Sequence, residues 1–131
     1  MGQMTHAVML GAPMVKPPKG KTWWGDSKEV GGEYVYEDGL LDMFKSGRGP
    51  KPETDENANV IGFFVACGAS GKSGVPDLKG PIDLARFEKA KPYAKAIAKA
   101  RKAWERFAVF CQKQGVKLEK PRFFLVETEV G

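Results

Sequence analysis

One stretch, residues 92–114, constrains the fold more than any other part of the chain. At about 100° per residue, its apolar side chains fall on one side of a helix and its cations on the opposite side. The apolar set is Tyr93, Ile97, Ala100, Trp104, Phe107 and Cys111, and the cations are Lys95, Lys99, Lys102, Arg106 and Lys113. Interspersed alanines favour helix, and Gly115 supplies a left-handed stop. The sequence therefore predicts a long amphipathic helix with a buried face and a basic face.

Four shorter stretches have the composition of β-strands. Residues 5–10 form an apolar run, and residues 33–37 alternate as in a half-exposed strand. Residues 59–67 are apolar on both alternating sets, as in a central strand covered on both faces. Residues 122–130 are apolar at first and alternate toward their end. These patterns predict a single α+β domain, ordered β-β-β-α-α-β, with a small, mostly antiparallel sheet of about four strands packed against the long C-terminal helix.

The connections carry further expectations. Residues 12–32 and 45–59 are predicted to be loops because prolines, glycines and charged residues dominate them. Gly80, Pro81 and Asp83 predict a first helical segment from about residue 81, with a kink or break at Pro92. Few helices are available to cover both faces of residues 59–67. A second copy of the chain is therefore a candidate cover, which makes a homodimer a hypothesis.

Charge is segregated along the chain. The formal net charge is +5, yet residues 82–122 carry twelve Lys/Arg against four Asp/Glu, and the remainder carries nine against twelve. Lys95, Lys99, Lys102 and Arg106 would extend along about 16 Å of helix, a spacing able to follow phosphates. This asymmetry favours a non-enzymatic protein that binds an anionic partner, most simply nucleic acid, although a solvated lysine face is an equally common reading.

A tryptophan pair follows a basic, proline-containing segment. Trp23 and Trp24 stand close to Lys19 and Lys21, and together they could form a stacking platform for unpaired bases. Packing in the core is the alternative, and it is preferred for at least one of the two rings because an exposed tryptophan is costly. A different hypothesis is a protein-interaction or inhibitor module, in which the acidic segment 26–42 or the tryptophans dock onto a protein. The small size of the chain suggests a phage or mobile-element origin for such a module.

A glycine-rich loop follows the predicted central strand. Its sequence fits a relaxed phosphate-loop pattern through Gly68, Ser70, Gly71, Lys72 and Ser73. Such a loop should open a helix, yet Gly74 and Pro76 follow at once. A flexible connection is the simpler interpretation. Binding of a nucleotide or phosphorylated small molecule at residues 68–74 is the alternative function.

Catalysis and metal binding have no positive support in the sequence. His6 is the only histidine, and Cys67 and Cys111 are expected to be buried, reduced thiols, so no metal set can be assembled and no cofactor is expected. The serines have no base specified by sequence. No apolar run is long enough to cross a membrane, so a cytoplasmic location is the expectation.

Overall fold

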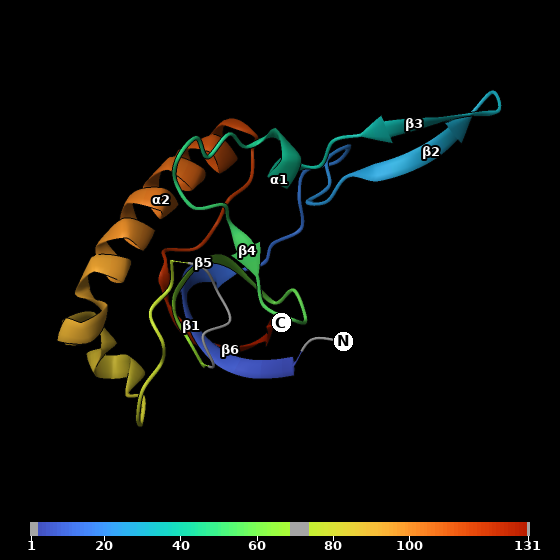
Figure 1. Ribbon diagram of the computed structural model, residues 1–131. Helices are drawn as coiled ribbons and strands as arrows, with labels where there is room; N and C mark the ends of the chain where they lie inside the picture. The colour runs from blue at the N-terminus through green and yellow to red at the C-terminus, as the bar shows by residue number, and fades with distance from the viewer. Residues whose placement is uncertain (1–2, 69–73, 131) are drawn as a thin grey trace.

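The fold is α+β, built on one four-stranded antiparallel sheet (Figure 1). The computed structural model describes residues 3–68 and 74–130. The sheet has the strand order β4-β5-β1-β6, which places β1 and β5 inside it. Its strands are β1 (Gln3–Pro13), β4 (Glu53–Thr54), β5 (Val60–Cys67) and β6 (Arg122–Val130).

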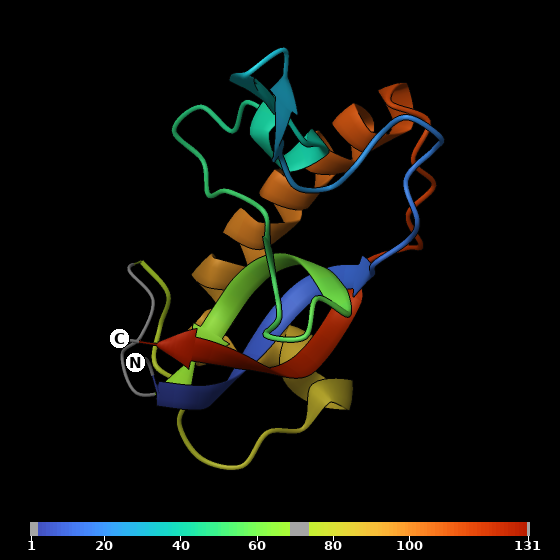
Figure 2. The ribbon, with the colours of Figure 1, turned by 90° about the vertical axis from the view of Figure 1, so that its right-hand side faces the viewer.

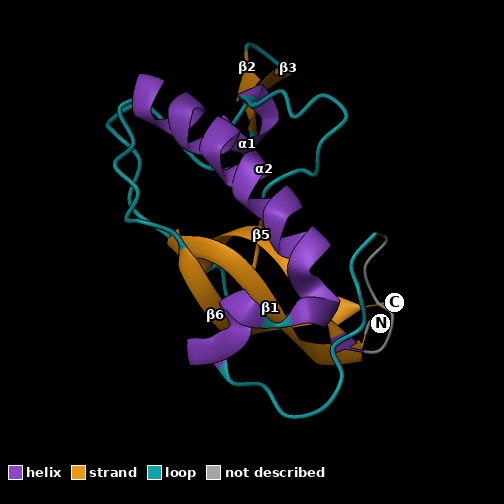
Figure 3. Cartoon of the chain, turned by 90° about the vertical axis from the view of Figure 1, so that its left-hand side faces the viewer, coloured by secondary structure: helices purple, strands orange, loops and turns teal. Residues whose placement is uncertain are grey.

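The central strand β5 is buried along its whole length, as its apolar sequence predicts. One sheet face, which includes Leu10 and Phe63, packs against the helix α2 (Ala94–Lys113), which lies in front of the sheet in Figure 3. The other face carries a second cluster around Met9 and Phe64. In Figure 2 the sheet curls strongly, and the segment before β5 approaches β6. There the Glu56 amide donates to the Glu127 carbonyl at 3.0 Å.

This curl removes the argument for a second copy that rested on the composition of β5. Both faces of the strand are covered within one chain, because α2 packs on one face and the curled sheet encloses the cluster on the other. Any association between copies must therefore use a different surface.

The predicted amphipathic helix is confirmed. α2 runs from Ala94 to Lys113, and Gly115 follows with φ of 80°, the left-handed conformation that ends a helix. The expected helical start at residue 81 is wrong: the 3₁₀ helix η2 (Leu84–Lys89) begins three residues later. Asp83 sets this start because its side chain accepts a hydrogen bond from the Ala85 amide. A second 3₁₀ helix, η3 (Lys91–Tyr93), contains the predicted break at Pro92.

A separate hairpin projects from the body of the protein (Figure 1). β2 (Asp26–Val30) pairs with β3 (Glu33–Glu37) in a sheet of their own. Gly31 and Gly32, with φ of 60° and 87°, form the tight turn that such a hairpin requires. The expectation that 12–32 is entirely loop is therefore wrong, as is the placement of residues 33–37 in the main sheet. β4 lies in the second predicted loop and takes their place there.

The structure bears on two further sequence expectations, the state of the cysteines and the absence of a membrane-spanning helix. Cys67 and Cys111 are buried and unpaired with each other, as predicted, and burial raises the pKa of the Cys111 thiol to about 12. That thiol stays protonated at ordinary pH. Within the described residues, no helix combines the length and the apolar composition of a membrane span.

A candidate basic interface on the long helix

The outer side of α2 carries a row of five exposed cations: Lys95, Lys99, Lys102, Arg106 and Lys113. Core residues such as Trp104 and Phe107 occupy its inner side, which fixes the direction of the row. From first to last, the row covers about 27 Å of helix axis. Among residues 3–68 and 74–130, no carboxylate forms an ion pair with any of the five. These charges are therefore available to a partner.

The loop between α1 (Leu40–Met43) and β4 adds cations that sequence reasoning missed. A Cβ built on Gly47 would lie 3.7 Å from one Arg106 guanidinium nitrogen, and one on Gly49 would lie 3.5 Å from the other, so the loop runs directly against the row. This loop contains three exposed cations and no acidic residue between positions 45 and 51. They are Lys45, Arg48 and Lys51. We call these three and the five cations of α2 the basic face.

Arg101, also on α2, has a structural role instead. Its guanidinium forms an ion pair with Glu88 of η2 and lies 5.7 Å from the centre of the Phe123 ring. These contacts fasten the 3₁₀ segment and β6 to the helix. Arg101 is therefore not part of the basic face, even though it lies on the same helix.

The segment before the hairpin reaches the C-terminal end of α2. Lys21 donates to the Gln114 carbonyl at 3.1 Å and to the Gln114 side-chain oxygen at 2.7 Å. Since a helix C-terminus carries unpaired carbonyls and partial negative charge, this contact stabilises the helix end. Lys21 is thus engaged within the protein, whereas Lys19 is exposed beside it.

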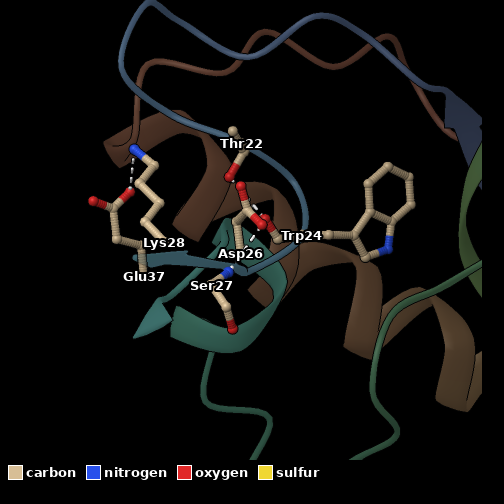
Figure 4. A network of polar contacts seen from close by, with 6 residues as sticks. All are labelled: Thr22, Trp24, Asp26, Ser27, Lys28 and Glu37. Atoms are coloured by element: carbon tan, nitrogen blue, oxygen red, sulfur yellow. Dashed lines mark hydrogen bonds and ion pairs between the residues drawn. The ribbon is translucent and has the colours of Figure 1, made fainter. Parts of the chain in front are cut away.

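The two adjacent tryptophans have opposite environments. Trp23 is 5% exposed, and its ring nitrogen donates to the Val15 carbonyl at 2.7 Å. The preference for a core position of at least one ring is thereby confirmed, and Trp23 cannot stack on a base. Trp24 is 51% exposed. Figure 4 shows its ring pointing away from the polar contacts at the base of the hairpin, which include the Thr22 hydroxyl donating to the Trp24 carbonyl at 2.8 Å.

Asp42 anchors the base of the hairpin. Its carboxylate accepts hydrogen bonds from the Gly39 amide at 2.9 Å and the Tyr36 hydroxyl at 3.0 Å. These bonds, the first being the larger effect, hold the pKa of Asp42 below its ordinary value of 3.8. Gly25 permits the close approach, because a Cβ there would lie 1.9 Å from the Tyr36 hydroxyl oxygen. The hairpin is therefore held in a defined direction.

Replacement of Asp42 by alanine is expected to loosen the hairpin without unfolding the main sheet. The pKa of Asp42 is lower in the folded protein than in the unfolded chain, so the anchor stabilises the hairpin at pH values above the unfolded-state pKa. This stabilisation is lost as the pH falls through the folded-state pKa, which lies below 3.8. Amide hydrogen exchange measured by NMR near neutral pH should be faster in β2 and β3 of the variant and unchanged in β5. Asp38→Ala removes an exposed neighbouring carboxylate and serves as control. Equal exchange in both variants would contradict the anchor.

The predicted phosphate loop lies largely outside the described residues. This applies to Ser70, Gly71, Lys72 and Ser73, while Gly68 directly follows β5. After the loop, the chain returns alongside the strand, and the Leu78 amide donates to the Cys67 carbonyl at 3.0 Å. The next helix begins only at Leu84, so the described surroundings offer no helix N-terminus directly after the loop.

Among the described residues, no group of three or more His, Cys, Asp or Glu side chains is placed to hold a metal ion. No family model matches this protein, and no curated protein or solved structure is significantly similar to it. The function must therefore be argued from the basic face and the surfaces around it.

Proposed function

We propose that this protein binds nucleic acid through its phosphates along the basic face and does so without catalysis. The carrying observation is that loop 45–51, which has three exposed cations, lies against Arg106 of α2, whose outer side carries a row of five exposed cations. Lysine and arginine side chains that neutralise phosphates release condensed counterions from the polymer. That release supplies binding free energy without a preformed pocket.

Contacts of this kind predict little sequence preference. Phosphate contacts position a protein on nucleic acid, whereas base-edge contacts specify the sequence. The basic face consists of flexible cations, mostly lysines, which act as point charges rather than rigid readers of bases. Trp24 remains as an exposed ring on which an unpaired base could stack.

The affinity for oligonucleotides is expected to fall steeply with salt. If about five phosphates are neutralised, the association constant should drop roughly 10²–10³-fold between about 50 and 200 mM monovalent salt. Fluorescence anisotropy with labelled single-stranded and duplex DNA of mixed sequence measures this. Binding that is insensitive to salt would contradict the proposal. Binding of a mononucleotide alone would instead point to residues 68–74.

A further inference from the structure

The β2–β3 hairpin is a prominent surface feature that the basic face does not explain. Every residue of both strands is exposed, including Tyr34 at 80%. Val30, Val35 and Tyr36 are also exposed. A lone two-stranded hairpin is marginally stable in water, and exposed tyrosines among polar residues are typical of protein contact surfaces. The hairpin therefore has the composition and the shape of a docking element.

The charge of the hairpin selects the chemistry of its partner. Residues 26–38 carry five carboxylates and one cation, Lys28, which forms an ion pair with Glu37 at 3.1 Å (Figure 4). Two hairpins aligned edge to edge would bring like charges together, which is destabilising. A surface that combines cations with apolar side chains is complementary to this hairpin.

The protein itself provides such a surface. A groove of about 540 Å³ lies between α1 and the segment leading to β4. Leu41, Phe44 and Pro52 give it apolar walls. Lys45 and Lys51 supply two positive charges against the single carboxylate of Asp42. The hairpin tip has a complementary set, since Glu29 is paired with Tyr34 across the strands and so lies on the same face. Glu33 lies on the opposite face, at the turn.

We propose that the hairpin tip of one copy docks in this groove of a second copy. Tyr34 packs against the apolar walls, and Glu29, on the same face, lies beside Lys45 and Lys51. Glu33, at the turn, adds negative charge at the edge of the contact. Figure 1 shows the hairpin pointing away from α1 and the loop that follows it, so the contact forms between copies rather than within one chain. The anchor at Asp42 lowers the cost of docking, because it holds the hairpin in one direction before contact.

Charge exchange between two variants tests this contact without any nucleic acid. One variant carries Glu29→Lys with Glu33→Lys, and the other carries Lys45→Glu with Lys51→Glu. Sedimentation velocity of the wild type at low salt should show concentration-dependent self-association. Each variant alone should associate at least about tenfold more weakly, and an equimolar mixture should regain association, because opposite charges face each other again.

Two further variants make the result specific. Tyr34→Ser keeps the charge of the hairpin and should weaken association. Glu119→Lys with Glu127→Lys makes the same change in net charge outside the hairpin and should leave association unchanged. Circular dichroism confirms that each variant is folded. A wild type that stays monomeric at every attainable concentration overturns the proposal, as does a mixture that fails to associate. These outcomes are independent of nucleic-acid binding.

Docking has a consequence that rests on the proposed function. Lys45 and Lys51 belong both to the basic face and to the groove, so a docked hairpin covers part of the surface offered to phosphates. Added oligonucleotide is therefore expected to dissociate self-associated protein. If self-association occurs but oligonucleotide neither binds nor dissociates it, the docking proposal stands and the proposed function fails.

Discussion

Reversal of four charges on α2, by Lys95→Glu, Lys99→Glu, Lys102→Glu and Arg106→Glu, is expected to weaken oligonucleotide binding at least about a hundredfold at low salt. The reason is twofold: each substitution removes one phosphate contact and places a carboxylate where the polymer backbone would lie. All four side chains are exposed, so the helix and core should remain folded. Fluorescence anisotropy gives the affinity, and the salt slope of the variant should also be shallower.

A matched control separates the basic face from net charge. Lysines 79, 89, 117 and 120 are exposed, lie outside α2, and change the net charge equally when replaced by glutamate. This control should lose far less affinity, because long-range attraction is screened within about a Debye length. If both quadruple variants lose affinity equally, binding depends on overall charge and the basic face is not a defined site.

The parts of the fold that were predicted correctly are those whose pattern depends only on residues close together in the sequence. α2 shows its period over twenty residues and carries its own stop at Gly115, so no distant contact is needed to recognise it. β5 is apolar at nearly every position, which indicates cover on both faces. The source of that cover was not predictable, because the curl of the sheet depends on strands that are far apart in sequence.

The hairpin shows where local patterns mislead. Residues 33–37 alternate like a half-buried strand, yet every one of their side chains is exposed. Their partner, Asp26–Val30, has almost no apolar residues, so its alternation gave no strand signal. The pairing is set instead by Gly31 and Gly32 and by the distant anchor at Asp42. In the sequence, such a hairpin is therefore indicated only by its Gly31-Gly32 turn.

The basic face was half predicted for a similar reason. Helical spacing alone places the five cations of α2 on one side. Loop 45–51 joins them because Phe44 at its start packs edge-on against Phe107 at 5.3 Å and also against Phe110. No spacing rule relates positions 44 and 107. The sequence does show three cations without a carboxylate at positions 45–51. Only the tertiary contact, however, places this loop beside α2.

Phe107 holds this arrangement together, and Phe107→Ala is expected to destabilise the protein by about 3–5 kcal/mol. Its ring is 0% exposed and lies within 6.4 Å, centre to centre, of five other aromatic rings. They belong to Trp23, Phe44, Phe63, Trp104 and Phe110. Truncation leaves a cavity at the point where four parts of the protein meet: the segment before the hairpin, the start of loop 45–51, the sheet and the helix. No single one of these elements can move in to fill the cavity.

Urea unfolding followed by circular dichroism measures this loss, with Val109→Ala as the control. Val109 lies on the same helix but is largely exposed, so its truncation should cost less than about 0.5 kcal/mol. Because Phe44 loses its packing partner, hydrogen exchange in loop 45–51 of Phe107→Ala should also rise more than exchange in β1, even where the protein remains folded. A loss below about 1 kcal/mol would show that the aromatic cluster can repack around the gap. The position of the loop cations would then depend on contacts other than Phe107, and the basic face would survive the substitution.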